Sequence, residues 1–193
     1  VVEAYNQIKP FEPVIKAVAA AKDEEERTLK DQVEITEIEA APFHEEDRAK
    51  DFAQRLKDLG LTNVRIDQEG NVIGIRPGTG NGPRLALGAH LDTVFPMGTN
   101  VKVRREGNKF YAPGISDDAR GLAVILEVLR TLQEQKIETV GDILFTATVG
   151  EEGNGDLRGS KYLFKSKEEH IDGFISVDSA DVESLLHGAT GSR

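Results

Sequence analysis

Four short segments of the sequence contain the acidic and imidazole side chains that could do chemistry. They are His90-Leu91-Asp92, Asp117-Asp118, Glu151-Glu152 and Asp178. Taken singly, each segment has an ordinary structural explanation. Aspartates are frequent in turns, and Asp118 could cap a helix N-terminus, where the helix dipole favours negative charge. Their common position relative to the predicted strands therefore decides whether they act together.

Three nearly continuous apolar runs are typical of strands buried in a sheet. They are residues 84–91, 142–149 and 173–177. The histidine segment closes the first run, the Glu pair follows the second, and Asp178 follows the third. Open α/β sheets bind their ligands just past the carboxyl ends of the strands. We therefore expect these side chains to converge at one edge of the sheet.

Such a cluster has the composition of a hydrolytic metal site. Oxygen and nitrogen ligands with an open coordination position suit zinc, or alternatively manganese or cobalt. Asp117 could bridge two cations, because a carboxylate has two oxygens. Two neighbouring carboxylates at a buried strand's end, as in Glu151-Glu152, are unfavourable unless something positive binds them. A metal would bind one and leave the other free to act as a base; the alternative is a solvated loop.

The remaining elements are those that must position these groups. Apolar spacing of three and four predicts helices over residues 12–21, 24–38, 45–59, 118–133 and 160–165, and hairpins join 64–67 to 72–75 and 101–104 to 109–111. Buried strands separated by helices indicate an α/β fold. We expect a three-layer sandwich, with a mostly parallel central sheet flanked by helices.

With these motifs in place, the sequence resembles the cocatalytic zinc metallopeptidases. That family includes glutamate carboxypeptidase, peptidase T-like tripeptide aminopeptidases, acetylornithine deacetylase, succinyl-diaminopimelate desuccinylase and aminoacylase. The matching stretches are residues 88–94 (GAHLDTV), 114–118 (GISDD), 150–153 (GEEG) and 176–178 (SVD), with 35–38 (ITEI) and 69–72 (EGNV) upstream. The resemblance covers almost the whole chain and implies a phosphorylase/hydrolase-like sandwich.

The resemblance also implies a role for each matched residue. His90 and Asp178 would hold one zinc ion, and Asp117 would bridge to a second ion, which Glu152 also binds. Asp92 would orient the metal-bound His90. Glu151 would be the general base, taking a proton from a water that bridges the two metals. Two cations about 3.5–4 Å apart acidify such a water and stabilise the oxyanion during hydrolysis of a peptide or N-acyl amide bond.

One part of the family's site is missing from this chain. The family takes a further His ligand from the far end of the catalytic domain, after an inserted lid or dimerisation domain. We therefore expect residues 1–185 to be the N-terminal part of the catalytic domain, and 186–193 to start the connection into the missing domain. None of His44, His170 and His187 is expected to replace that ligand. The fragment should then be inactive, its parent a homodimer through the missing domain, and an apolar surface should be exposed where the missing half packs.

Two other interpretations stay open. One is a lid-less di-zinc aminopeptidase of a related group, and the other is a non-catalytic module that kept the fold. A degenerate copy usually loses the base or the bridging ligand first, yet Glu151 and Asp117 are both present. The expected substrate is a small peptide or an N-acyl amino acid. Arg120 and Arg158 lie near the motifs and are interpreted as solvated surface arginines.

Composition excludes several other classes of site and partner. The 193 residues contain no cysteine and have a net charge of −10. Disulfides, thiolate metal sites and a cysteine nucleophile are thus excluded, and neither nucleic acid nor an anionic membrane is an expected partner. No run approaches the roughly 20 apolar residues of a transmembrane helix. We expect a cytoplasmic protein, with secretion or the periplasm left open because the chain begins Val1-Val2.

Overall fold

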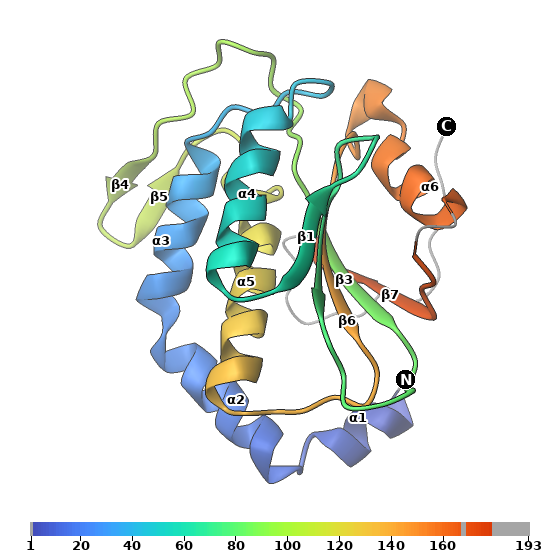
Figure 1. Ribbon diagram of the computed structural model, residues 1–193. Coiled ribbons are helices and arrows are strands. Elements are labelled where there is room, and N and C mark those ends of the chain that lie inside the picture. The colour runs from blue at the N-terminus through green and yellow to red at the C-terminus, as the bar shows by residue number, and fades with distance from the viewer. Residues whose placement is uncertain (1, 167–168, 179–193) are drawn as a thin grey trace.

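A computed structural model of the chain describes residues 2–166 and 169–178 and shows a mixed α/β fold (Figure 1). The predicted junction at 186–193 lies outside the described residues, as does His187. A five-stranded sheet has the order β1-β2-β6-β3-β7. These strands are β1 (Thr62–Ile66), β2 (Val72–Arg76), β3 (Leu85–His90), β6 (Ile143–Thr148) and β7 (Gly173–Ser176).

The direction of the strands confirms the predicted fold class. β3 pairs in parallel with β6 on one side and with β7 on the other. β2 runs antiparallel to both of its neighbours, β1 and β6, so it is the strand of this sheet that runs against the others. The central sheet is therefore mostly parallel, with β3 in the middle of its parallel part.

Helices cover both faces of the sheet. α3 (Glu25–Thr36), α4 (Glu46–Asp58) and α5 (Ala119–Glu134) lie on one face, and α6 (Arg158–Lys165) lies on the other (Figure 1). All six residues of β6 are buried, because side chains on both of its faces are covered. The larger core lies under α4 and α5, and a smaller one lies under α6 around Leu163.

The hairpin that precedes α5 differs from the prediction in one respect. Its strands are β4 (Arg104–Glu106) and β5 (Lys109–Tyr111), so the first begins at Arg104, whereas the sequence predicted residues 101–104. The backbone N–H of Val103 donates to the Glu37 carboxylate at 3.0 Å, and that of Lys102 donates to the Asn100 side chain at 3.1 Å. These amide groups therefore bond to side chains rather than to a partner strand.

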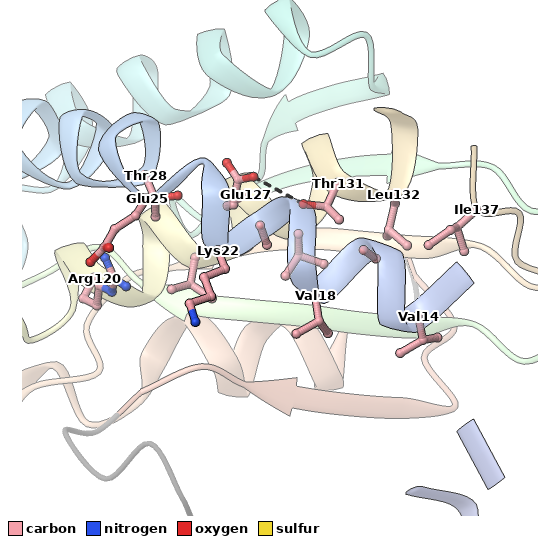
Figure 2. Close-up of a pocket in the computed structure, with 14 residues that line it drawn as sticks. Val14, Val18, Lys22, Glu25, Thr28, Arg120, Glu127, Thr131, Leu132 and Ile137 are labelled. Atoms are coloured by element: carbon pink, nitrogen blue, oxygen red, sulfur yellow. Dashed lines mark hydrogen bonds between the residues drawn. The ribbon is translucent and has the colours of Figure 1, made fainter. Parts of the chain in front are cut away.

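The N-terminal helices present an apolar surface. α1 (Val2–Ile8) is followed by α2 (Glu12–Asp23), and no residue of α2 is buried. A hollow of about 580 Å³ separates α2 from α5, with Val14, Val18, Leu132 and Ile137 along it (Figure 2). α2 therefore presents exposed apolar side chains such as Ile15 and Val18, while the packing of a missing half on an apolar surface stays a prediction. In the described part of the chain, no helix combines the length and the apolar character needed to cross a bilayer.

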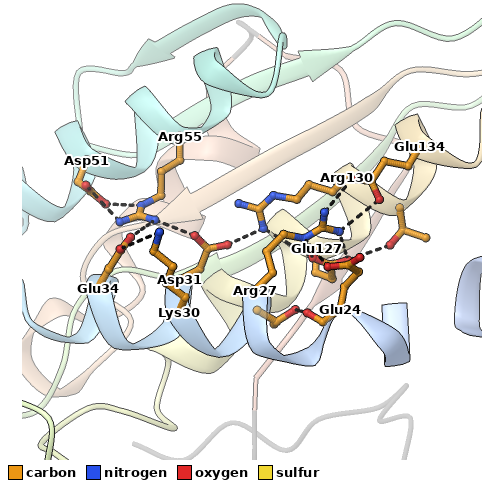
Figure 3. Close-up of polar contacts among 12 residues, drawn as sticks. Glu24, Arg27, Lys30, Asp31, Glu34, Asp51, Arg55, Glu127, Arg130 and Glu134 are labelled. Carbon is orange, nitrogen blue, oxygen red and sulfur yellow. Dashed lines mark hydrogen bonds and ion pairs between the residues drawn. The ribbon is translucent and has the colours of Figure 1, made fainter. Parts of the chain in front are cut away.

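Ion pairs join α3, α4 and α5 to one another (Figure 3). Asp31 of α3 accepts a hydrogen bond from Arg55 of α4 at 2.8 Å and another from Arg130 of α5. Its side chain is only 8% exposed. Arg27 adds a second link between α3 and α5 through Glu127, at 2.7 Å. The network thus fastens the C-terminal half of α5, where Arg130 lies, to α3 and α4.

Replacing Asp31 by Asn should lower the free energy of unfolding by about 1.5–3 kcal/mol, the usual contribution of hydrogen bonds to charged groups. The change keeps the side-chain size but leaves the two arginines without their shared carboxylate. Urea unfolding followed by circular dichroism measures the effect. The matched control is Asp47→Asn, because the Asp47–Lys50 pair is exposed and should contribute little. Equal stability of the two variants would contradict the prediction.

Candidate metal centre

The predicted site segments meet at the carboxyl ends of the three parallel strands. His90 is the last residue of β3 and pairs in register with Thr148, the last residue of β6. The chain therefore leaves β6 level with His90 and reaches Glu151 three residues later. Asp178 follows β7 in the same way, and Asp117 and Asp118 directly precede α5. The convergence that the sequence predicted is confirmed.

Two overlapping groups of side chains could hold metal ions among the described residues. One consists of His90, Asp117 and Glu152, and the other of His90, Asp118 and Asp178. Within each group the potential ligand atoms all lie within 4.8 Å of one another. All four predicted metal ligands therefore belong to one group or the other, with His90 common to both.

The buried His90 ring is oriented for ligation through one nitrogen. Nδ1 lies 2.9 Å from the backbone oxygen of Asp92, so Nδ1 must carry a proton to make this bond. Nε2 then points at Asp117, whose Oδ1 is 2.9 Å away. Burial lowers the pKa of His90, but the surrounding carboxylates outweigh it and raise the pKa to about 10. In the metal-free protein a proton on Nε2 therefore takes the place that a cation would take.

Asp92 is fully buried and holds the backbone of the Glu pair. Its Oδ1 accepts the N–H of Glu151 and its Oδ2 accepts the N–H of Glu152, each at 2.9 Å. Its carboxylate is 3.7 Å from His90 Nδ1, so the closer contact to the ring is the backbone oxygen. Burial would raise the pKa of Asp92, but His90 and the two N–H groups lower it below its usual value. That Asp92 orients His90 stays a prediction. The structure adds its contact with the loop after β6, which carries Glu151 and Glu152.

Asp118 caps α5. Its Oδ1 accepts the N–H of Gly121 and its Oδ2 accepts the N–H of His90, both at 3.0 Å. Burial, supported by the nearby charge of Asp178, raises the pKa of Asp118 to about 8 against the attraction of His90. The helix-cap explanation of Asp118 is thus confirmed. Asp117, joined to it by a cis peptide bond, is 62% exposed and open to a cation.

Glu151 and Glu152 are half-buried at the edge of this cluster. Burial raises the pKa of Glu151, and the charges of Asp178, Asp92 and Asp117 add to this effect against that of His90. Burial and the charges of Asp117 and Glu151 likewise raise the pKa of Glu152. An excess of carboxylates beside a single imidazole is a donor set that fits a divalent cation.

A hollow of about 690 Å³ adjoins Glu152. Its walls include Phe43, Val94, Phe95 and Met97, and His44 also lies along it. His44 belongs to neither ligand group. His170 is 80% exposed and lies 2.9 Å from Asp172, also outside both groups. Within the described residues, His90 is the histidine of both ligand groups, and the expectation that none of the other histidines acts as a ligand stays a prediction.

Sequence reasoning missed the arginines that support the site. Arg48 is fully buried, and its Nη1 donates to the backbone oxygen of Leu91, the residue after His90, at 2.7 Å. Burial lowers its pKa to about 10. The sequence did contain a signal that Arg48 is buried, because it stands four residues before Phe52 on the apolar face of the predicted helix. The interpretation of Arg158 as a solvated arginine is wrong, since it is 19% exposed and pairs with the buried Glu45.

Metal binding should release at least one proton and strengthen as the pH rises. The neutral ring is needed for ligation, and a His90 pKa of about 10 means that the ring is protonated near neutral pH. Apparent zinc affinity should then increase about tenfold per pH unit between about pH 6 and pH 8. Titration calorimetry in buffers of different ionisation enthalpy counts the protons. Binding without proton release would contradict this picture of His90.

Comparison with known proteins gives a consistent result. The family model described as Peptidase family M20/M25/M40 matches residues 86–189. Carboxypeptidase G2 of Pseudomonas sp. (strain RS-16) is 35% identical over an alignment 184 positions long, which covers 89% of this chain and 44% of that protein. Succinyl-diaminopimelate desuccinylase of Corynebacterium glutamicum is 29% identical over 157 residues, 81% of this chain and 40% of that protein.

Solved structures support the same assignment. The crystal structure of aminopeptidase PepT from Bacillus cereus ATCC 10987 matches with a TM-score of 0.68 and 29% identity, over 80% of this chain and 43% of that one. The chain thus spans less than half the length of these relatives. With the family model covering more than half of its residues, the chain belongs to the peptidase family M20/M25/M40, whose members are generally metal-dependent hydrolases.

Proposed function

We propose that this chain is the first part of a longer di-zinc enzyme that hydrolyses a peptide or N-acyl amide bond. The observation that carries the proposal is the grouping of His90, Asp117 and Glu152, with ligand atoms within 4.8 Å, directly beside Glu151. The names of the relatives, a carboxypeptidase, a desuccinylase and an aminopeptidase, support amide-bond hydrolysis.

The proposed ligands divide between two ions. His90 and Asp178 would hold one zinc, Glu152 the other, and Asp117 would contact both; cobalt or manganese suits the same oxygen and nitrogen donors. When bound, the ions would polarise the scissile carbonyl and lower the pKa of the attacking water. A further ligand for the second ion would come from residues beyond this chain, and so would the proposed dimerisation.

Glu151 is the proposed general base. Its backbone is fixed by Asp92, whose Oδ1 accepts the N–H of Glu151 at 2.9 Å. Its pKa is raised by burial and by neighbouring carboxylates, which brings it nearer to the pH at which a base works best. The carboxylate would take a proton from the water and return it to the leaving amine.

The hollow beside Glu152 supports a substrate with an apolar group next to the scissile bond. Its aromatic and aliphatic walls, which include Phe43 and Phe95, would exclude water from that group. A small peptide or an N-acyl amino acid has the right size. Whether the enzyme is an exopeptidase or a deacylase depends on parts of the substrate site that this chain does not contain.

In the full-length protein, Glu151→Gln should reduce kcat by about 10²–10⁴-fold, the usual contribution of a general base. Gln keeps the shape of the side chain but cannot accept the proton. Zinc stoichiometry, measured by titration calorimetry, should stay the same, since Glu151 is not a proposed ligand. Glu26→Gln, at an exposed position of α3, is the matched control. Full activity in Glu151→Gln would rule out this residue as the base.

The isolated 193-residue chain should bind one zinc ion tightly and a second one weakly or not at all. His90→Ala should abolish the tight site, because His90 belongs to both ligand groups. We expect no turnover of peptide or N-acyl substrates by this fragment. Measurable turnover that Glu151→Gln abolishes would show instead that the residues present suffice for catalysis.

A further inference from the structure

A buried glutamate outside the ligand groups bonds to the loop that carries Glu151 and Glu152. The side chain of Glu45, just before α4, is 4% exposed. Its Oε1 accepts the backbone N–H of Gly150 at 3.1 Å. Together with the two bonds to Asp92, this means that three successive N–H groups, those of residues 150, 151 and 152, each donate to a buried carboxylate.

Arg158 supplies the positive charge that Glu45 needs. Its Nη2 donates to both oxygens of Glu45 at 2.7 Å, although the two residues are 113 positions apart. Its Nη1 donates to the backbone oxygen of Glu69 at 2.9 Å and to the Glu69 side chain at 3.1 Å. The guanidinium group lies 5.0 Å from the centre of the Phe43 ring. Arg158 thus joins the start of α4 and the β1–β2 turn to the loop after β6.

The loop is packed closely against this arginine. Gly150 has a φ of +62°, and a Cβ at this position would lie 2.7 Å from Cγ and Nε of Arg158. Asp156 and Leu157, which lead into α6, also have left-handed φ values of 52° and 56°. Non-glycine residues adopt this conformation only where the surrounding structure holds them. The backbone at Gly150 and at residues 156–157 is therefore constrained where it packs around the Arg158 side chain.

A buried ion pair is a poor device for stability alone. The free energy lost when two charges leave water offsets much of the attraction between them. Apolar side chains of similar size often stabilise a protein as well or better. A carboxylate that accepts a backbone N–H nevertheless fixes that group in direction, which an apolar side chain cannot do. We therefore explain the Glu45–Arg158 pair by its effect on the position of the loop after β6, rather than by a contribution to the stability of the fold.

We propose that Glu45 and Arg158 form a positioning pair that sets the orientation of Glu151 and Glu152. The proposal rests on the function proposed above, in which these glutamates are the base and a metal ligand. Neither Glu45 nor Arg158 touches the metal or the substrate. The pair acts through the N–H of Gly150, so loosening it changes the direction of the next two side chains. The enzyme then loses zinc affinity and kcat, while KM changes little.

The test compares Arg158→Met and Glu45→Gln with Asp31→Asn in the full-length protein. Arg158→Met removes the charge and keeps an apolar stem. Glu45→Gln keeps an acceptor for the N–H of Gly150 and should have the smaller effect. Asp31→Asn lowers stability through the helix network, away from the loop, and therefore controls for instability alone. Arg158→Lys, which keeps the charge, should restore part of what Arg158→Met loses.

Three readouts separate positioning from folding. Hydrogen exchange at residues 150–152 should become at least about tenfold faster in Arg158→Met, the effect of losing a hydrogen bond to a charged acceptor. Zinc affinity, measured by competition with a chelator, should fall at least about tenfold, and kcat should fall with KM nearly constant. Asp31→Asn should leave all three readouts unchanged, despite its lower stability.

The outcomes distinguish this proposal from the function on which it rests. If the wild type binds zinc, and Arg158→Met binds it equally well with unchanged exchange at residues 150–152, the positioning pair is ruled out and the function stands. If the wild type binds no zinc, the proposed function fails, and hydrogen exchange still decides whether the pair holds the loop. If Arg158→Met does not fold, Glu45→Gln and Arg158→Lys provide the same comparison.

Discussion

Mutual repulsion among the carboxylates around His90 is the constraint on which the rest of the site depends. Six acidic side chains share one edge of the sheet, namely those of Asp92, Asp117, Asp118, Glu151, Glu152 and Asp178. Among the described residues, the His90 ring, the buried Arg48 and backbone N–H groups oppose their charge, and the pKa of His90 rises accordingly. A divalent cation relieves the same repulsion more fully, which gives metal binding a large electrostatic driving force.

The scaffold separates charges that hold the backbone from charges left open to a ligand. Asp92, Asp118 and Glu45 are buried, and each accepts at least one backbone N–H from the segments that form the site. Asp117 and Asp178 are exposed, and Glu151 and Glu152 are half-buried. The buried carboxylates can be held in place because N–H groups and arginines neutralise them.

Charged side chains also position the elements from farther away. The Asp31 network fastens the C-terminal half of α5 to α3 and α4. Arg48 holds the loop after β3 from within the core, and Arg158 acts on the loop after β6. The open side of the site, where Asp117 and Asp178 face solvent, suits the proposal that residues beyond this chain complete it.

The sequence alone determined the elements and the order of the ligands. Hydrophobic periodicity located the helices and strands, and parallel strands bring their carboxyl ends to one edge, so the convergence of His90, Glu152 and Asp178 was predictable. The tertiary structure decided the partners of Glu45, Arg48 and Arg158, and the start of β4. These features depend on single contacts between segments as far as 113 residues apart, and one such contact leaves no periodic pattern in the sequence.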